Sequence, residues 1–161
     1  MKKYICDDKN MPQNIDIEKA VLGALIIESI AIEKVINMLK PEIFYLEIHQ
    51  IIVKTIIAMY EKKYSIDILT VEERLRKKKH LNAIGGSEYL RTIVTNIGSS
   101  AHIGYHIRII IDKYVAREMV KISHDIKLRA LHDFEDIGDI ISDYHNQMNT
   151  LFRYIKKINL D

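Results

Sequence analysis

The sequence I-H-Q-I-I-V-K-T-I-I-A-M-Y, from Ile48 to Tyr60, is apolar on nearly every side of a helix. Its isoleucines and its methionine recur at intervals of three and four residues, the spacing of an amphipathic helix. Only Gln50, Lys54 and Glu61 mark a narrow polar stripe. A run of 13 residues is too short to span a bilayer. We therefore expect a central core helix that neighbouring elements surround.

Composition limits what can surround this helix. The chain has 161 residues, of which 48% are apolar and 29% charged, as in an ordinary soluble protein of one domain or one domain with an appendage. The net charge of +2 provides no overall field toward nucleic acid or an anionic membrane. A single cysteine, Cys6, cannot form an internal disulfide, and residues 1–10 lack the apolar segment of a signal peptide. These features favour a cytoplasmic protein without membrane contact.

Short helices are expected on both sides of the central one. Upstream, Asp16 is a candidate N-cap for a helix with an apolar face between Ile17 and Ile26. A second helix, Ile32–Leu39, should end before the proline at position 41. Downstream, Thr70 and Glu73 match a capping box, which predicts another helix start.

A glycine pair and a change of pattern organise the rest of the chain. Gly85-Gly86 should interrupt it, and Ser87 can cap the helix that follows. Beyond residues 96–100, apolar residues recur every three or four positions up to Ile126 and again from Ile137. Two long amphipathic helices joined by a short loop predict an antiparallel hairpin.

We therefore predict an all-α fold, a compact six-helix head followed by a long helical hairpin. The expected parts are a flexible tail (1–11), the head (12–97), the hairpin (98–157) and the start of a linker or tail (158–161). Because two helices alone bury little surface, the outer faces of the hairpin should pair with a second copy. Apolar residues off the main stripe, Val120 and Leu128, indicate a second contact face. The expected dimer residues are Ile107, Ile111, Tyr114, Met119, Tyr144 and Met148.

The sequence contains no catalytic motif. No phosphate-binding loop, G-x-S-x-G motif or cysteine pair occurs, so we expect neither catalytic nor cofactor-binding residues in this chain. His102 and His106 lie four apart and could share a metal, but no third ligand is evident. We interpret them as solvated or capping histidines and expect no metal site.

Two charged clusters have structural interpretations as well as functional ones. The run Arg74–His80 could neutralise phosphates, yet no aromatic residue interrupts it, and cations favour the end of a helix. The acidic cluster of Asp133, Glu135, Asp136 and Asp139 lies at an expected helix start, where carboxylates are favourable. A solvated face and a helix start are the simpler interpretations.

Five segments follow one another in a familiar order. They are Pro12–Ala24 (P-Q-x-I-x-x-E-x-A-V-L-G-A), Phe44–Gln50 (F-Y-x-x-x-H-Q), Ile66–Val71 (I-D-I-L-T-V), Ile84–Leu90 (I-G-G-x-x-Y-L) and Tyr105–Arg117 (Y-x-x-R-I, then Lys and Arg). In this order and spacing they resemble the N-terminal domain of bacterial replicative DNA helicases of the DnaB type. The family often has proline or asparagine where Ser65, Gly98 and His102 stand, which affects only turns and caps.

The resemblance implies a role in assembly and docking. In that family the hairpins pair between subunits, giving dimers and a trimer of dimers that forms a collar and docks the helicase-binding domain of primase. Carried over by motif, the primase-contacting residues would be Tyr89, Val120 and Ile126. The chain itself would not be an enzyme. The parent would be an ATP-dependent DNA helicase whose ATP and Mg²⁺ are bound in a separate RecA-like domain, and this chain would reach DNA only indirectly. A helicase loader is a further partner that the resemblance allows.

Two other classes of function stay open. The chain could be a free-standing adaptor, a loader or inhibitor that pairs with the hairpin of a helicase, instead of an excised N-terminal domain. It could also be a nucleic-acid-binding module that uses residues 74–80.

Overall fold

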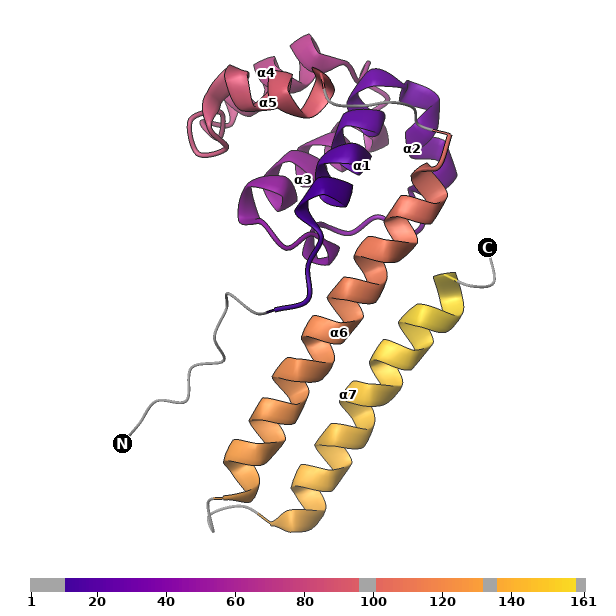
Figure 1. Cartoon of the computed structure of the whole chain (residues 1–161), viewed down its shortest axis with the longest axis vertical. Helices are drawn as coiled ribbons and strands as arrows, with labels where there is room; N and C mark the ends of the chain where they lie inside the picture. Colours follow the sequence, from indigo (N-terminus) through magenta and orange to yellow (C-terminus); the bar gives the residue numbers. More distant parts are fainter. Residues whose placement is uncertain (1–10, 96–100, 132–135, 159–161) are drawn as a thin grey trace. The chain divides into compact units, whose positions relative to one another are not determined.

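The computed structural model describes residues 11–95, 101–131 and 136–158, which fold into seven α-helices and one short 3-10 helix without any strand among them. The all-α prediction is confirmed. Two compact units divide the chain (Figure 1). The head unit is Gln13–Tyr114, and the hairpin unit joins Met11 and Pro12 to the described residues from Val115 onward.

The head unit consists of short helices that follow one another closely. In chain order they are α1 (Ile15–Ile27), α2 (Ser29–Val35), the 3-10 helix η2 (Pro41–Ile43), α3 (Glu47–Glu61), α4 (Ile68–Lys77) and α5 (Gly86–Thr95). The second helix begins and ends earlier than the predicted Ile32–Leu39. Before the proline the chain has already left helical geometry, because Lys40 is extended with φ −141° and ψ 144°.

The core of the head has two central helices, not one. The predicted core helix, α3, buries Ile52, Val53 and Ile56 completely, while Lys54 on its polar stripe is exposed. However, α1 contacts α2, α3, α4 and α5, and its residues Val21–Ile26 are all buried. Since α1 has no polar stripe along that run, it shares the centre of the head with α3.

Two helix starts differ from their predictions. The N-cap of α1 is Asn14, whose Oδ1 accepts from the Ile17 N–H at 3.2 Å, rather than Asp16. The N-cap of α4 is Asp67, whose carboxylate accepts from the Leu69 and Thr70 N–H groups, each at 2.9 Å, while the Thr70 hydroxyl accepts from the Asp67 N–H at 3.0 Å. Thr70 is therefore at the N3 position of the capping box, not at its N-cap, because the helix starts one turn earlier than the pattern suggested.

The hairpin unit contains α7 and the second half of α6. Helix α6 (Ile103–Ala130) runs through both units, and α7 (Ile137–Ile158) lies antiparallel beside its later part (Figure 1). Arg129 Nη2 donates to Asp143 Oδ2 at 3.0 Å and so connects the two helices. The predicted head–hairpin boundary between residues 97 and 98 lies outside the described residues, as do the predicted tail residues 1–10 and 159–161.

The residues before α1 are attached to α6. Arg117 is only 5% exposed, and its Nη1 donates to the carbonyl oxygen of Pro12 at 2.9 Å. Met11 is buried as well. Among the described helices, none is long and apolar enough to cross a membrane.

The capping box of α4 gives the first testable prediction. Replacing Asp67 by alanine removes the acceptor of two backbone N–H groups and should lower the free energy of unfolding by about 1 kcal/mol in a urea titration at pH 7. A Ser65→Ala control, which affects only a weak 3.4 Å contact to Asp67, should leave the unfolding free energy nearly unchanged.

The stability that Asp67 contributes should also depend on pH. Hydrogen bonds from the backbone of Thr70, and then of Leu69, lower the pKa of the Asp67 carboxyl below its ordinary value of 3.8. Because the pKa of Asp67 is lower in the folded state, the ionised carboxylate stabilises the fold above pH 3.8. This stabilisation is lost as the pH falls through the folded-state pKa. The difference between the native chain and Asp67→Ala should therefore narrow below pH 3.8; a constant difference would contradict the cap.

Candidate functional site

A chain of buried polar side chains connects three helices of the head. Glu18 comes from α1, His49 from the first turn of α3 and Tyr89 from α5. His49 Nδ1 lies 2.6 Å from Glu18 Oε2, and His49 Nε2 lies 2.7 Å from the Tyr89 hydroxyl. Glu18 is 1% exposed and His49 is fully buried. We call these residues the Glu18–His49–Tyr89 relay.

Both oxygens of the Glu18 carboxylate have partners. Oε1 accepts from the backbone N–H of Tyr45 at 2.6 Å, and Oε2 faces the imidazole. With the ring proton on Nδ1 directed at the carboxylate, Nε2 is an acceptor and the Tyr89 hydroxyl donates to it. Every polar atom of the relay is therefore paired, which is the condition under which buried polar groups are tolerated.

The outer end of the relay is a half-buried tyrosine. The Tyr89 ring stacks on His49 with centroids 6.0 Å apart and an angle of 22° between the planes. Burial, and then the negative charge of Glu18, raise the pKa of the Tyr89 hydroxyl above its ordinary value of 10.0. The phenol consequently stays protonated, and its hydroxyl contact and its stacking on His49 together orient the ring.

The glycine pair before α5 makes room for this tyrosine. Gly85 has φ +95°, and a Cβ built on it would lie 3.2 Å from the Cβ of Tyr89. Gly86 has φ +75°, which also favours glycine. The predicted interruption at these residues is thus a backbone requirement of the site, and α5 begins at Gly86, one residue before the predicted cap Ser87.

The other predicted docking residues lie on α6 in the hairpin unit. Val120 is 37% exposed and Ile126 is half-buried. Ile126 lines a groove of about 330 Å³ between α6 and α7. The remaining residues of that groove are Ser123, Ile140, Ile141 and Tyr144.

The six predicted dimer residues fall into three groups by exposure. Ile107 and Ile111 are buried within the single chain, so they are not available to a partner, and Tyr114 and Met148 are half-buried. Met119 and Tyr144 are exposed. Tyr144 belongs to a longer exposed apolar stripe along α7, whose other members are Ile137, Ile141 and Phe152.

The clusters that sequence patterns singled out have structural roles. His102 and His106 have ring centroids 6.4 Å apart, and no group of three metal-binding side chains occurs among the described residues. In the basic run, Arg76 and Lys77 form ion pairs with glutamates one turn earlier on α4. Asp136 accepts from the N–H of Gly138 at 2.7 Å as a cap, while Asp133 and Glu135 lie outside the described residues.

Sequence reasoning placed Tyr89 in the site but missed the two residues behind it. In the sequence, Glu18 and His49 are notable only as members of the segments Pro12–Ala24 and Phe44–Gln50, which resemble the helicase family. Two signals could have indicated a buried pair. Glu18 is a charged residue one position after an apolar stripe begins, and His49 lies within a run that is largely apolar.

Comparisons with known proteins agree with this architecture. Residues 10–112 match the family model described as DnaB-like helicase N terminal domain. A replicative DNA helicase DnaB of Rhodothermus marinus is 36% identical over 132 residues, covering 82% of this chain and 14% of the relative. A probable replicative DNA helicase of Trieres chinensis is 34% identical over 149 residues, covering 92% of this chain and 33% of the relative. The chain thus spans a third or less of the length of these relatives.

A solved structure extends the agreement to the fold. The crystal structure of the N-terminal domain of DnaB helicase from Mycobacterium tuberculosis superposes with a TM-score of 0.80 at 25% sequence identity. The match covers 87% of this chain and 99% of the other.

The relay predicts strong coupling between its members. Glu18→Ala should lower the free energy of unfolding by on the order of 3 kcal/mol, because it leaves the buried imidazole and the Tyr45 N–H without their partner. His49→Ala should have a similar cost, and the double variant should cost clearly less than the sum. Urea titrations of the four chains measure this cycle.

A matched control distinguishes burial from charge. Glu88→Ala removes a carboxylate that is exposed on α5 and lies 3.7 Å from Arg91, so its effect should stay within about 0.5 kcal/mol. Additive costs in the Glu18 and His49 cycle would show that the two side chains do not act as a pair.

Proposed function

Because this chain belongs to the family of DnaB-like helicase N-terminal domains, we propose that it is the collar domain of a replicative DNA helicase, which pairs subunits and docks primase. The observation that supports pairing most directly is the exposed apolar stripe on α7. Both named relatives are replicative helicases by name, and the match to the second covers 92% of this chain.

Pairing through the hairpin follows from what the hairpin leaves uncovered. Ile140 and Leu151 of α7 are buried, so one side of α7 already packs against other residues of the same chain. Ile137, Ile141 and Phe152 are 59%, 61% and 63% exposed on an adjoining side. A continuous apolar stripe of this kind is costly in water and is covered favourably by the same stripe of a second copy. Pairs of this kind would then assemble into a trimer of dimers.

Docking of primase is proposed for two separate surfaces, Tyr89 on the head unit and Val120 with Ile126 on the hairpin unit. Tyrosine is a frequent anchor of protein interfaces, and the relay holds this one in a single orientation before any partner arrives. Val120 offers exposed apolar surface on the outer side of α6. Docking on the collar would place primase beside the helicase, where the two activities must be coordinated.

The remaining activities belong to the parent protein in this proposal. ATP and Mg²⁺ would be used by a separate ATPase domain, and this chain would be a non-catalytic part of an ATP-dependent helicase in the cytoplasm. Contact with DNA would be indirect, and a helicase loader is a further partner of the collar. Two cations of the basic run, Arg76 and Lys77, form ion pairs within α4, which favours this assignment over direct DNA binding, since phosphates would compete with Glu73 for them.

Docking can be tested by titrating the helicase-binding domain of primase into the chain in a calorimeter. Tyr89→Ala should weaken binding by at least about tenfold, and Tyr89→Phe by less, because the ring remains and only the hydroxyl is lost. Tyr105→Ala removes a tyrosine on α6 that is 68% exposed, and this variant should bind the primase domain like the native chain. Unchanged affinity of a folded Tyr89→Ala chain would remove Tyr89 from the docking site.

Pairing can be tested by light scattering behind a sizing column over a wide range of concentration. The native chain should form dimers or larger assemblies, and Ile141→Ser combined with Phe152→Ser should raise the dissociation constant on the order of a hundredfold. Leu69→Ser removes an exposed apolar side chain from the head and should leave the dissociation constant unchanged. A native chain that stays monomeric at every concentration would contradict pairing through the hairpin alone.

A further inference from the structure

A pocket on the head lies apart from the relay. It has a volume of about 420 Å³ and is formed by the end of α3, the loop after it and one side of α4. Its lining residues are Met59, Tyr64, Ser65, Leu69, Thr70, Glu73, Arg74 and Lys77. Met59 follows His49 by ten residues on α3, which corresponds to about 15 Å along the helix axis. The pocket is therefore a separate surface from the one around Tyr89.

The pocket contains a cation that no carboxylate of the described residues neutralises. The Arg74 guanidinium lies over the Tyr64 ring, with Cζ 5.1 Å from the ring centroid. Its Nε is buried and has no hydrogen-bond partner, and Arg74 forms no ion pair among the described residues. In contrast, Arg76 and Lys77 on the same helix both pair with Glu73.

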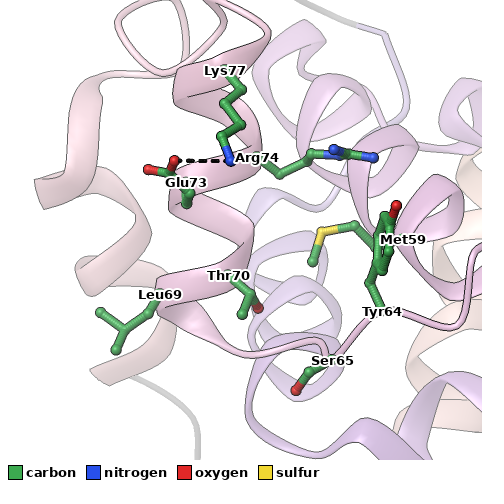
Figure 2. A pocket seen from close by; sticks show the side chains of 8 residues that line it. All are labelled: Met59, Tyr64, Ser65, Leu69, Thr70, Glu73, Arg74 and Lys77. Carbon is green, nitrogen blue, oxygen red and sulfur yellow. Dashed lines mark ion pairs between the residues drawn. The ribbon is translucent and has the colours of Figure 1, made fainter.

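The walls around this guanidinium are largely apolar. Figure 2 shows Met59, Tyr64 and Arg74 gathered beside the loop, with Leu69 and the Glu73–Lys77 ion pair along the exposed side of α4. Leu69 is 74% exposed and Tyr64 is 51% exposed. Tyrosine and arginine are the residue types that protein interfaces often use as anchors, and Leu69 adds exposed apolar surface to the same pocket.

We propose that this pocket binds an acidic, apolar segment of a partner protein, whose carboxylate pairs with Arg74 while a neighbouring apolar side chain covers Leu69 and Met59. Stacking on Tyr64 holds the guanidinium plane, and a held plane suits the two oxygens of a carboxylate. A nucleic-acid backbone fits less well, because it needs several free cations and would leave the apolar walls in water. The site is independent of primase docking at Tyr89, so either proposal can fail alone.

The proposal can be tested by NMR on the ¹⁵N-labelled chain, in which the Arg74 Nε–H gives its own signal. The probe is N-acetyl-leucyl-glutamyl amide, which joins one apolar and one acidic side chain. It should shift the signals of Arg74 Nε–H, Leu69 and Met59. The glutaminyl analogue, which lacks the charge, and the seryl-glutamyl analogue, which lacks the apolar group, should each bind about tenfold more weakly.

Matched variants assign the binding to this pocket. Arg74→Gln should weaken the leucyl-glutamyl probe about tenfold. Arg76→Gln removes the same charge from the same helix outside the pocket and should leave affinity unchanged. Leu69→Ala, at a largely exposed position that folding does not depend on, should also weaken the probe and keeps the test valid if Arg74→Gln fails to fold.

Three results would overturn the proposal. The first is an absence of shifts at the pocket at any soluble concentration of the probe, or shifts that Arg74→Gln and Leu69→Ala leave unchanged. The second is binding of a short DNA duplex that Arg74→Gln abolishes, which would assign the pocket to nucleic acid. The third is binding of octanoate while the peptide probe is excluded, which would assign it to a small acid.

Discussion

The head depends on a constraint that buried polar atoms impose. Glu18, His49 and Tyr89 come from three different helices, and His49 is paired at both ring nitrogens only if Glu18 and Tyr89 are in place. A buried polar network adds little net stability, since the hydration that its members lose offsets the hydrogen bonds that they form. What it adds is a penalty on any packing that separates α1, α3 and α5, because such a packing would leave a carboxylate or an imidazole unpaired in the core. The apolar contacts around α1 supply stability, and the relay selects one arrangement of them.

The same constraint connects the core with the surface. Tyr89 is half-buried, and its hydroxyl contacts the buried His49, so the paired hydroxyl orients a ring that is partly exposed. A partner that uses this ring meets a side chain already ordered, so less conformational entropy is lost on binding. The hairpin differs, because the stripe on α7 is apolar and exposed and would be covered by a second molecule under the proposed pairing. The proposed collar function requires both a docking surface on the head and a pairing surface on the hairpin.

The pocket beside Tyr64 adds a third kind of surface, in which one cation lies between apolar walls. Its position on α4 changes the interpretation of the basic run. The run has mixed roles, since Arg76 and Lys77 neutralise a neighbouring glutamate, whereas Arg74 points into the pocket and stacks on a tyrosine. Charge counted along a sequence cannot distinguish these roles, because the distinction depends on what a second helix places opposite each side chain.

The sequence by itself determined the all-α class, the central helix now seen as Glu47–Glu61, the hairpin and the interruption at Gly85-Gly86. These follow from apolar periodicity and backbone preferences, which act over a few residues and are legible locally. Only the tertiary structure decided that α1 shares the centre, that Asn14 and Asp67 are the caps, and that Ile107 and Ile111 are already covered. It alone brought Glu18 to His49, 31 residues apart, and His49 to Tyr89, 40 residues apart. The physical reason is that burial and pairing of polar groups are properties of contacts between distant segments, and a linear pattern does not specify which segments meet.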